Sequence, residues 1–210
     1  MKPYHKINNI FTRDNITGKL NYGDWSSLEF DSLKDADWRL YEKIDGTNIR
    51  IIWHNGILSI RGRSDNSQIP AHLLDILREL FPHEKLVNVF GITDKQICLY
   101  GEGFGFKIQK TGYNYDSKKA KFALFDININ DFWLDDKTRN GIATALGCEE
   151  APFIRCENLI DALKMVESGL CSSYGKFIAE GIIAKPKCEL LNQQGHRIIA
   201  KIKTIDFLFH

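Results

Sequence analysis

The chain has 210 residues and a formal net charge of +1, with 43% hydrophobic and 26% charged residues. These values are ordinary for a globular protein with a real core, and the length suits one large domain or two small ones. No apolar run approaches the length of a membrane span, and the N-terminal sequence lacks the apolar core of a signal peptide, so we expect a cytoplasmic protein.

The five cysteines are odd in number, widely scattered and without a CxxC pair. This pattern argues against structural zinc and suits a reducing compartment. The near-neutral net charge does not indicate which kind of partner the protein binds, because a local basic groove can lie opposite an acidic face.

Apolar stretches along the chain predict strands. In chain order they cover residues 38–44, 47–53, 57–60, 96–104, 121–129, 177–185 and 197–203. Asn55-Gly56, between the second and the third, is a strong signal for a tight hairpin turn. Side chains alternate between the two faces of a strand, so Lys201 and Lys203 should share one face while Ile202 points to the other.

Helices are predicted between these strands. Residues 71–81 carry leucines and an isoleucine at helical spacing, with Pro70 near the start. Residues 138–146 and 157–168 are each followed by a glycine, which commonly ends a helix. Many strands with a few helices indicate an α+β fold with mostly antiparallel sheets.

Lys43 stands in an unusual place for a charged residue, at the end of an apolar strand. Alone, Lys43-Ile44-Asp45-Gly46 is a weak pattern, and a lysine that extends from a sheet edge into solvent explains it as well. Other polar motifs lie at or beside the predicted strands, and together they supply a nucleophilic amine, cations, carboxylates and an aromatic ring. They are Arg61-Gly62-Arg63-Ser64, Tyr100-Gly101-Glu102-Gly103, Phe125-Asp126, Glu180-Gly181 with Lys185, and Lys201-Ile202-Lys203.

Several of these residues have plainer explanations when taken singly. Phe125 lies in an apolar strand and could belong to the core, and Arg63 could be a solvated charge. The glycines after Tyr100 do not complete a dinucleotide-binding fingerprint, because residue 106 is Phe. Ordinary solvated surface is expected at Asp116, Lys118, Lys119, Asp135 and Asp136.

In this order, the motifs resemble those of the RNA ligase 2-like family, part of the covalent nucleotidyltransferase superfamily that also holds DNA ligases and mRNA capping enzymes. The resemblance runs from residue 42 to residue 203. Thr47-Asn48 is more typical of RNA ligases than of the other two classes. The resemblance implies the nucleotidyltransferase (ATP-grasp-like ligase) fold, with two mainly antiparallel sheets flanked by helices and the nucleotide cleft between them.

The resemblance also implies a role for each motif residue. Lys43 attacks the α-phosphorus of ATP to form a lysyl-N-AMP, while Lys201 and Lys203 contact the α-phosphate. Glu180 holds Mg²⁺ or Mn²⁺. The implied nucleotide-binding residues are Glu42 at the adenine edge, Asn48 and Arg63 at the sugar-phosphate, Glu102 at the ribose hydroxyls and Phe125 stacked on adenine.

The implied protein is an ATP-dependent RNA ligase of RNA repair. It self-adenylylates, transfers AMP to a 5′-phosphate and joins that end to a 3′-OH. We expect a monomer that binds RNA ends, in a nicked duplex or a single strand, and no membrane. We also expect a single adenylyltransferase domain over residues 1–210, without a C-terminal OB or helical domain, which a partner protein could supply.

Three alternatives stay open. The chain could seal nicks in DNA or RNA–DNA duplexes, or transfer GMP from GTP as capping-type guanylyltransferases do. It could also be a non-catalytic module that binds nucleotides or RNA ends. The presence of Lys43, Glu180 and both motif lysines argues against this last alternative.

Overall fold

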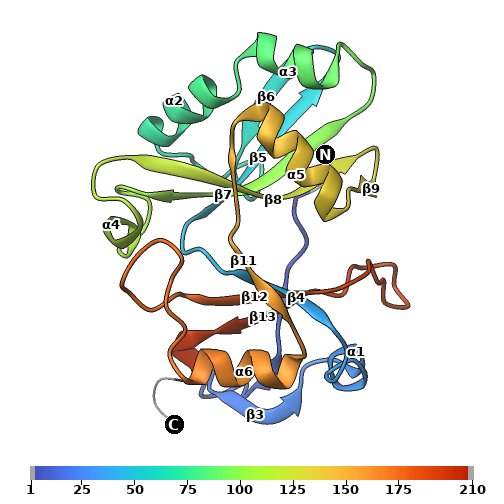
Figure 1. The fold of residues 1–210 in the computed structure, drawn as a ribbon, viewed down its shortest axis with the longest axis vertical. Helices are drawn as coiled ribbons and strands as arrows, with labels where there is room; N and C mark the ends of the chain where they lie inside the picture. The colour runs from blue at the N-terminus through green and yellow to red at the C-terminus, as the bar shows by residue number, and fades with distance from the viewer. Residues whose placement is uncertain (1–2, 208–210) are drawn as a thin grey trace. The chain divides into compact units, whose positions relative to one another are not determined.

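The computed structural model describes residues 3–207, and the chain forms two compact units. Unit 1 comprises the N-terminal residues up to Tyr4 and Asp45–Ala151, and unit 2 comprises His5–Ile44 and the residues from Pro152 onwards. Each unit has its own sheet and its own hydrophobic core (Figure 1). Within residues 3–207, none of the helices combines the length and the apolar character that crossing a bilayer requires.

The sheet of unit 1 is mainly antiparallel, with only its short edge strand β10 running parallel to β8. In spatial order its strands are β10 (Glu149–Glu150), β8 (Ala120–Ile129), β7 (Ile97–Gly105), β5 (Thr47–His54) and β6 (Ile57–Arg61), and β9 (Phe132–Trp133) pairs with β8. The predicted hairpin turn is confirmed between β5 and β6, where Asn55 and Gly56 have φ angles of 51° and 75°.

Three helices cover one face of this sheet: α2 (Ala71–Leu80), α3 (His83–Phe90) and α5 (Asp136–Leu146) (Figure 1). The alternation of β5 sends Ile49 and Ile51 into the core under these helices, where Leu73 and Leu77 of α2 meet them. The same alternation leaves Asn48 on the other face, which these helices do not cover. The short helix α4 (Gly112–Tyr115) lies in the loop between β7 and β8.

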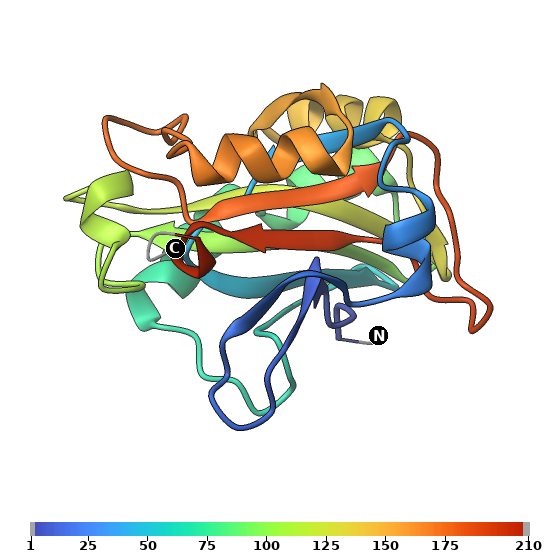
Figure 2. The ribbon, with the colours of Figure 1, turned by 90° about the horizontal axis from the view of Figure 1, so that it is seen from below.

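The sheet of unit 2 is also mainly antiparallel, with only β1 parallel to its neighbour. In spatial order its strands are β1 (Asn8–Asn9), β13 (Ala200–Lys203), β12 (Gly181–Pro186), β4 (Trp38–Glu42) and β11 (Phe153–Glu157). Figure 2 shows α6 (Leu159–Glu167) running along β12 and β13, and the hairpin of β2 (Phe11–Arg13) and β3 (Leu20–Trp25) standing out in blue. Helix α1 (Leu28–Ser32) and a 3-10 turn (Thr204–Asp206) complete the unit.

The core of unit 2 lies on the α6 side of its sheet. Trp38 and Leu40 of β4 and Ile202 of β13 are buried there with the inner face of α6. The lysines on either side of Ile202 are only half-buried, which confirms that Lys201 and Lys203 share the opposite face.

Two predicted strands are wrong in extent, because local turns take up their first residues. Strand β12 begins at Gly181, not at 177, since the N–H of Ser172 donates to the carbonyl of Phe177 (2.8 Å) and closes a loop there. Strand β13 begins at Ala200, not at 197, because Arg197 pairs with Leu191 in a separate turn.

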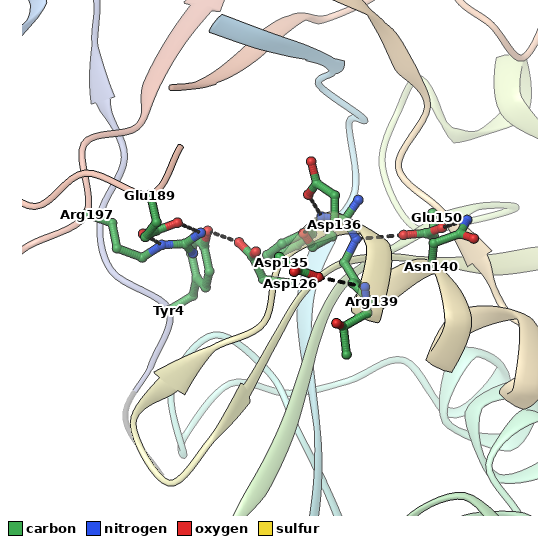
Figure 3. A network of polar contacts seen from close by, with 11 residues as sticks. Tyr4, Asp126, Asp135, Asp136, Arg139, Asn140, Glu150, Glu189 and Arg197 are labelled. Carbon is green, nitrogen blue, oxygen red and sulfur yellow. Dashed lines mark hydrogen bonds and ion pairs between the residues drawn. The ribbon is translucent and has the colours of Figure 1, made fainter. Parts of the chain in front are cut away.

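Asp135 and Asp136, expected to be ordinary surface, hold the start of α5 in place. The Asp135 carboxylate accepts a hydrogen bond from the N–H of Thr138 (2.7 Å), which satisfies a donor that the first helical turn leaves open. Asp136 pairs with the buried Arg139, whose Nε lies 2.6 Å from Glu150 (Figure 3). The helix therefore starts earlier than the predicted residue 138.

We predict that Asp135→Ala destabilises the protein by about 1 kcal/mol, the usual effect of losing a side-chain cap. The change should appear as a lower Tm in thermal unfolding followed by circular dichroism. Lys137→Ala, at an exposed position of the same helix, is the control. Equal melting temperatures for the two variants would contradict the capping role.

Candidate active site

Lys43 follows β4 directly and forms an ion pair that centres on Glu180. The Nζ of Lys43 lies 2.6 Å from Oε2 of Glu180, and their side chains are 22% and 20% exposed. The Nζ of Lys203 lies 3.2 Å from the other oxygen, Oε1. One half-buried carboxylate thus separates two lysines that are distant in sequence, and the cluster keeps a net positive charge.

Backbone pairing places Glu180 at this point. The N–H of Lys43 donates to the carbonyl of Gly181 (2.9 Å), and the N–H of Thr204 donates to the carbonyl of Glu180 (2.9 Å). Gly181 has a φ of 152°, and a Cβ there would lie 1.9 Å from the carbonyl oxygen of Ile202. Only glycine allows this close approach of β12 to β13, which explains why glycine follows the glutamate.

Lys201 adds a further cation to the same face of β13. Burial lowers the pKa of Lys201, and the nearby charges of Lys203 and Lys43 lower it further, with smaller effects from Lys6 and Arg13. Within residues 3–207, Lys201 has no ion-pair partner. A face with more cations than carboxylates attracts an anionic group such as a phosphate.

Glu42 is 2% exposed and pairs with the core residue Ile182 in the β4–β12 register. Its carboxylate accepts hydrogen bonds from the hydroxyl of Ser172 (2.5 Å) and the N–H of Ser173 (2.7 Å). Neither serine could be predicted from the sequence, since no pattern in their loop links them to Glu42. The contact of Glu42 with an adenine edge stays a prediction.

Asn48 and Glu102 lie directly opposite each other in the β5–β7 register, on the face of the unit 1 sheet away from its core. Oδ1 of Asn48 is buried and has no hydrogen-bond partner among the residues that the structure describes. An unsatisfied buried acceptor costs about 1–3 kcal/mol. A bound ligand with an N–H or O–H donor would remove this cost.

Phe125 lies at a β-bulge in the same sheet. Tyr100 pairs with Asp126 and Gly101 with Leu124, so Phe125 has no residue opposite it. It is half-buried and does not belong to the core cluster of unit 1, so the core explanation is wrong for this residue.

Tyr4, which the sequence analysis also missed, packs beside Phe125. The ring of Tyr4 stands edge-on to that of Phe125, with 5.0 Å between the centroids. Its hydroxyl donates to the carboxylate of Asp126 (Figure 3). The ring contact packs Tyr4 against Phe125, and no periodicity in the sequence points to either contact.

Arg63 lies in an exposed bend after β6, and the bend is held by a buried arginine that sequence reasoning did not single out. The side chain of Arg50 is 0% exposed, its Nε donates to the carbonyl of Gly62 (2.9 Å), and its Nη2 lies 2.7 Å from Asp65. This hydrogen bond from Arg50 keeps the pKa of Asp65 below its ordinary value. Arg50 therefore positions the segment that carries Arg63.

The segment that follows Lys43 is anchored to the β7–β8 loop within unit 1. The N–H of Asp45 donates to the hydroxyl of Tyr115 (3.0 Å), and the carboxylate of Asp45 accepts from Thr111. The carbonyl of Gly46 accepts from Nε2 of Gln109 (3.0 Å). The Asp-Gly pair of the lysine motif is thus a structural anchor.

The residues present fit one kind of metal binding. Across residues 3–207, no group of three or more His, Cys, Asp or Glu side chains is arranged to hold a metal ion. Mg²⁺ commonly uses only one or two protein carboxylates together with water and phosphate oxygens. Glu180 fits such a cation, bound jointly with a phosphate, and the site does not fit a metal cage built from protein alone.

Unit 2 therefore brings Lys43, Glu180, Lys201 and Lys203 together, as the sequence predicts. Unit 1 places Asn48 beside Glu102, carries Phe125 in the same sheet and presents Arg63 on a loop.

Solved structures share this fold. A variant of Naegleria gruberi RNA ligase with AMP and Mn is 18% identical over 86% of this chain and 53% of its own, with a TM-score of 0.65. A second variant with ATP and Mn has the same identity and coverage and a TM-score of 0.64. The same ligase with PPi is 17% identical over 98% of this chain and 63% of its own, with a TM-score of 0.66.

The fold is the α+β nucleotidyltransferase fold of RNA ligases. The chain spans about half the length of the first two proteins.

The profile of the family described as RNA ligase matches residues 36–203, which is most of the chain. The chain belongs to the RNA ligase family. No curated protein sequence gives a significant match.

Burial and the nearby charges of Lys203 and Lys43 predict that Lys201 lowers the stability of the fold at neutral pH. Its pKa is lower in the folded state, so its protonated form destabilises the fold at neutral pH, and this effect fades as pH rises through the lowered pKa. Lys201→Met should therefore raise Tm at pH 7, and the gain should shrink at higher pH.

Lys203→Met is the matched control, because Lys203 pairs with Glu180 and its loss should lower Tm. Thermal unfolding of both variants between pH 7 and pH 10 tests this. A fall in Tm for Lys201→Met as large as for Lys203→Met would contradict the prediction.

Proposed function

We propose that this protein is an ATP-dependent RNA ligase in which Lys43 takes AMP from ATP. The observation that carries the proposal is the cluster of Lys43, Glu180 and Lys203, with Lys201 beside it, in a member of the RNA ligase family. The similar Naegleria structures with AMP or ATP and Mn support the class of nucleotide and metal.

In the first step, Nζ of Lys43 attacks the α-phosphorus of ATP. A phosphorus–nitrogen bond forms, the bond to the pyrophosphate oxygen breaks, pyrophosphate leaves and the amine loses its proton. Glu180 holds Nζ of Lys43, so Lys43 must leave that ion pair before it can attack. The charges of Lys201 and Lys203 stabilise the negative charge on the phosphate.

Glu180 is the residue that would hold Mg²⁺ or Mn²⁺. Such a cation neutralises phosphate charge. A Glu180 carboxylate that held such a cation would be less available to the ammonium of Lys43.

Each nucleotide-binding residue is assigned its own role. We assign the ribose hydroxyls to Glu102, and the sugar-phosphate to Arg63 and to Asn48, whose Oδ1 is unsatisfied and which lies opposite Glu102. Stacking of adenine on Phe125 would contribute about 1–3 kcal/mol. Glu42 would read the adenine edge from a carboxylate that Ser172 and Ser173 hold in one orientation.

Two later steps complete the proposed reaction. An oxygen of an RNA 5′-phosphate attacks the phosphorus of the lysyl-AMP, and the phosphorus–nitrogen bond breaks to free Lys43. A 3′-OH then attacks the adenylylated 5′-phosphate, the new phosphodiester forms and AMP leaves. The substrate would be RNA ends in a nicked duplex or a single strand.

Incubation with α-labelled ATP and Mg²⁺ or Mn²⁺ tests the first step. We expect a label that survives denaturing electrophoresis and is released by acid, as a phosphoramidate is. Lys43→Ala should carry none, whereas Lys187→Ala, at an exposed position of unit 2, should be labelled like the parent. An unlabelled parent, or a label that persists in Lys43→Ala, would rule the proposal out.

The role of Glu180 predicts a dependence on metal concentration. Glu180→Ala should slow self-adenylylation by at least about 10-fold, because even groups that only support a metal ligand typically contribute about 10–100-fold. Raising Mn²⁺ should recover part of the rate if the variant binds the cation more weakly. Initial rates measured against Mn²⁺ concentration check this, with Glu79→Ala on the exposed side of α2 as control. A rate equal to that of the control would contradict the assignment.

A further inference from the structure

The loop between β7 and β8, residues 106–119, exposes aromatic rings next to lysines. The rings of Phe106 and Tyr113 stand at 81° with 5.5 Å between their centroids, and Tyr113 is 51% exposed. Nζ of Lys107 lies 5.0 Å from the centroid of the Phe106 ring. Phe106 and Tyr113 thus present aromatic rings to solvent beside the charged amine of Lys107.

Positive charge dominates this part of the chain. Between residues 106 and 121 there are five lysines, and Asp116 is the only acidic residue. The carboxylate of Asp116 is already engaged, because it accepts the backbone N–H groups of Lys118 and Lys119 and pairs with Lys121 (3.3 Å). In the described part of the chain, Lys107 and Lys110 have no carboxylate partner and are exposed.

The loop is held firmly at several points. Gln109, Thr111 and Tyr115 bond to the backbone or side chain of Asp45-Gly46, and Nε2 of His72 lies 2.9 Å from the carbonyl oxygen of Phe106. Asp45 is only two residues beyond Lys43 in the chain. The loop is therefore pre-organised, and it is bonded to the segment that follows the nucleophile.

We propose that residues 106–119 bind the single-stranded end of the RNA substrate. Proteins that hold single strands combine aromatic rings, on which bases stack, with cations that follow the backbone, and this loop supplies both. Tyr113 and Phe106 stack on unpaired bases, while Lys107 and Lys110 contact phosphates. A free phosphate would not stack on the rings, and an apolar peptide would not pair with the lysines. The assignment rests on the proposed ligase function, and it names the part of the substrate that the loop takes.

Fluorescence anisotropy of the full chain with a short labelled single-stranded RNA tests the proposal. Tyr113→Ala should weaken binding about tenfold, in line with the loss of one stacked base. Each phosphate contact contributes about 0.7 to the slope of log K against log salt for single strands. The double variant Lys107→Ala/Lys110→Ala should therefore reduce that slope by about 1.4.

Matched controls come from the same unit. Phe132→Ala removes an aromatic ring that is 77% exposed, and Lys137→Ala removes an exposed lysine of α5. Both should bind RNA like the parent. On a blunt RNA duplex, which offers no unpaired bases, Tyr113→Ala should bind like the parent as well.

Two results would overturn the proposal: no measurable RNA binding by the parent, or loop variants that bind single-stranded RNA as tightly as the two controls. Self-adenylylation with ATP alone separates this proposal from that for Lys43. Tyr113→Ala should label normally, which also shows that it is folded. An unlabelled parent that still binds RNA through Tyr113 would remove the assignment of Lys43 and leave the loop assignment standing.

Discussion

The arrangement depends on one carboxylate shared by two lysines. Glu180 is the only acidic partner that Lys43 and Lys203 have among residues 3–207, and Lys201 has none. The cluster is therefore electrically unbalanced and favours an anion. The same ion pair engages Nζ of Lys43, so the residue that holds the amine in place also keeps it from attacking. Binding of ATP and a cation would reverse both effects, because each competes for one member of the pair.

In each unit, the core residues lie on one face of the sheet and most candidate site residues lie on the other. In unit 2, α6 packs on the face that buries Trp38, Leu40 and Ile202, and the opposite face carries the lysines. In unit 1, helices α2, α3 and α5 cover the face that holds the core, and the other face carries Asn48 and Glu102. Alternation along a strand produces this division, and Glu42, on the core side of β4, is a buried exception.

The features that alternation and turn chemistry encode could be predicted from the sequence. The β5–β6 hairpin, helix α2 and the shared face of Lys201 and Lys203 all depend on residues a few positions apart. The hydrogen bonds that orient the site could not be predicted, because their partners are far apart in the chain. Ser172 is 130 residues from Glu42, and Tyr4 is 122 residues from Asp126. The bulge that leaves Phe125 without a residue opposite it depends on the register of β7 and β8, which the hydrophobic pattern of the sequence does not determine.

Mass spectrometry of the intact protein after incubation with ATP and Mn²⁺ tests whether Lys43 takes AMP. We expect a mass gain of one AMP moiety, located by fragmentation on the peptide that contains Lys43. The gain should disappear on addition of pyrophosphate, which reverses the step. No gain in mass, or an AMP moiety located on another residue, would contradict the account.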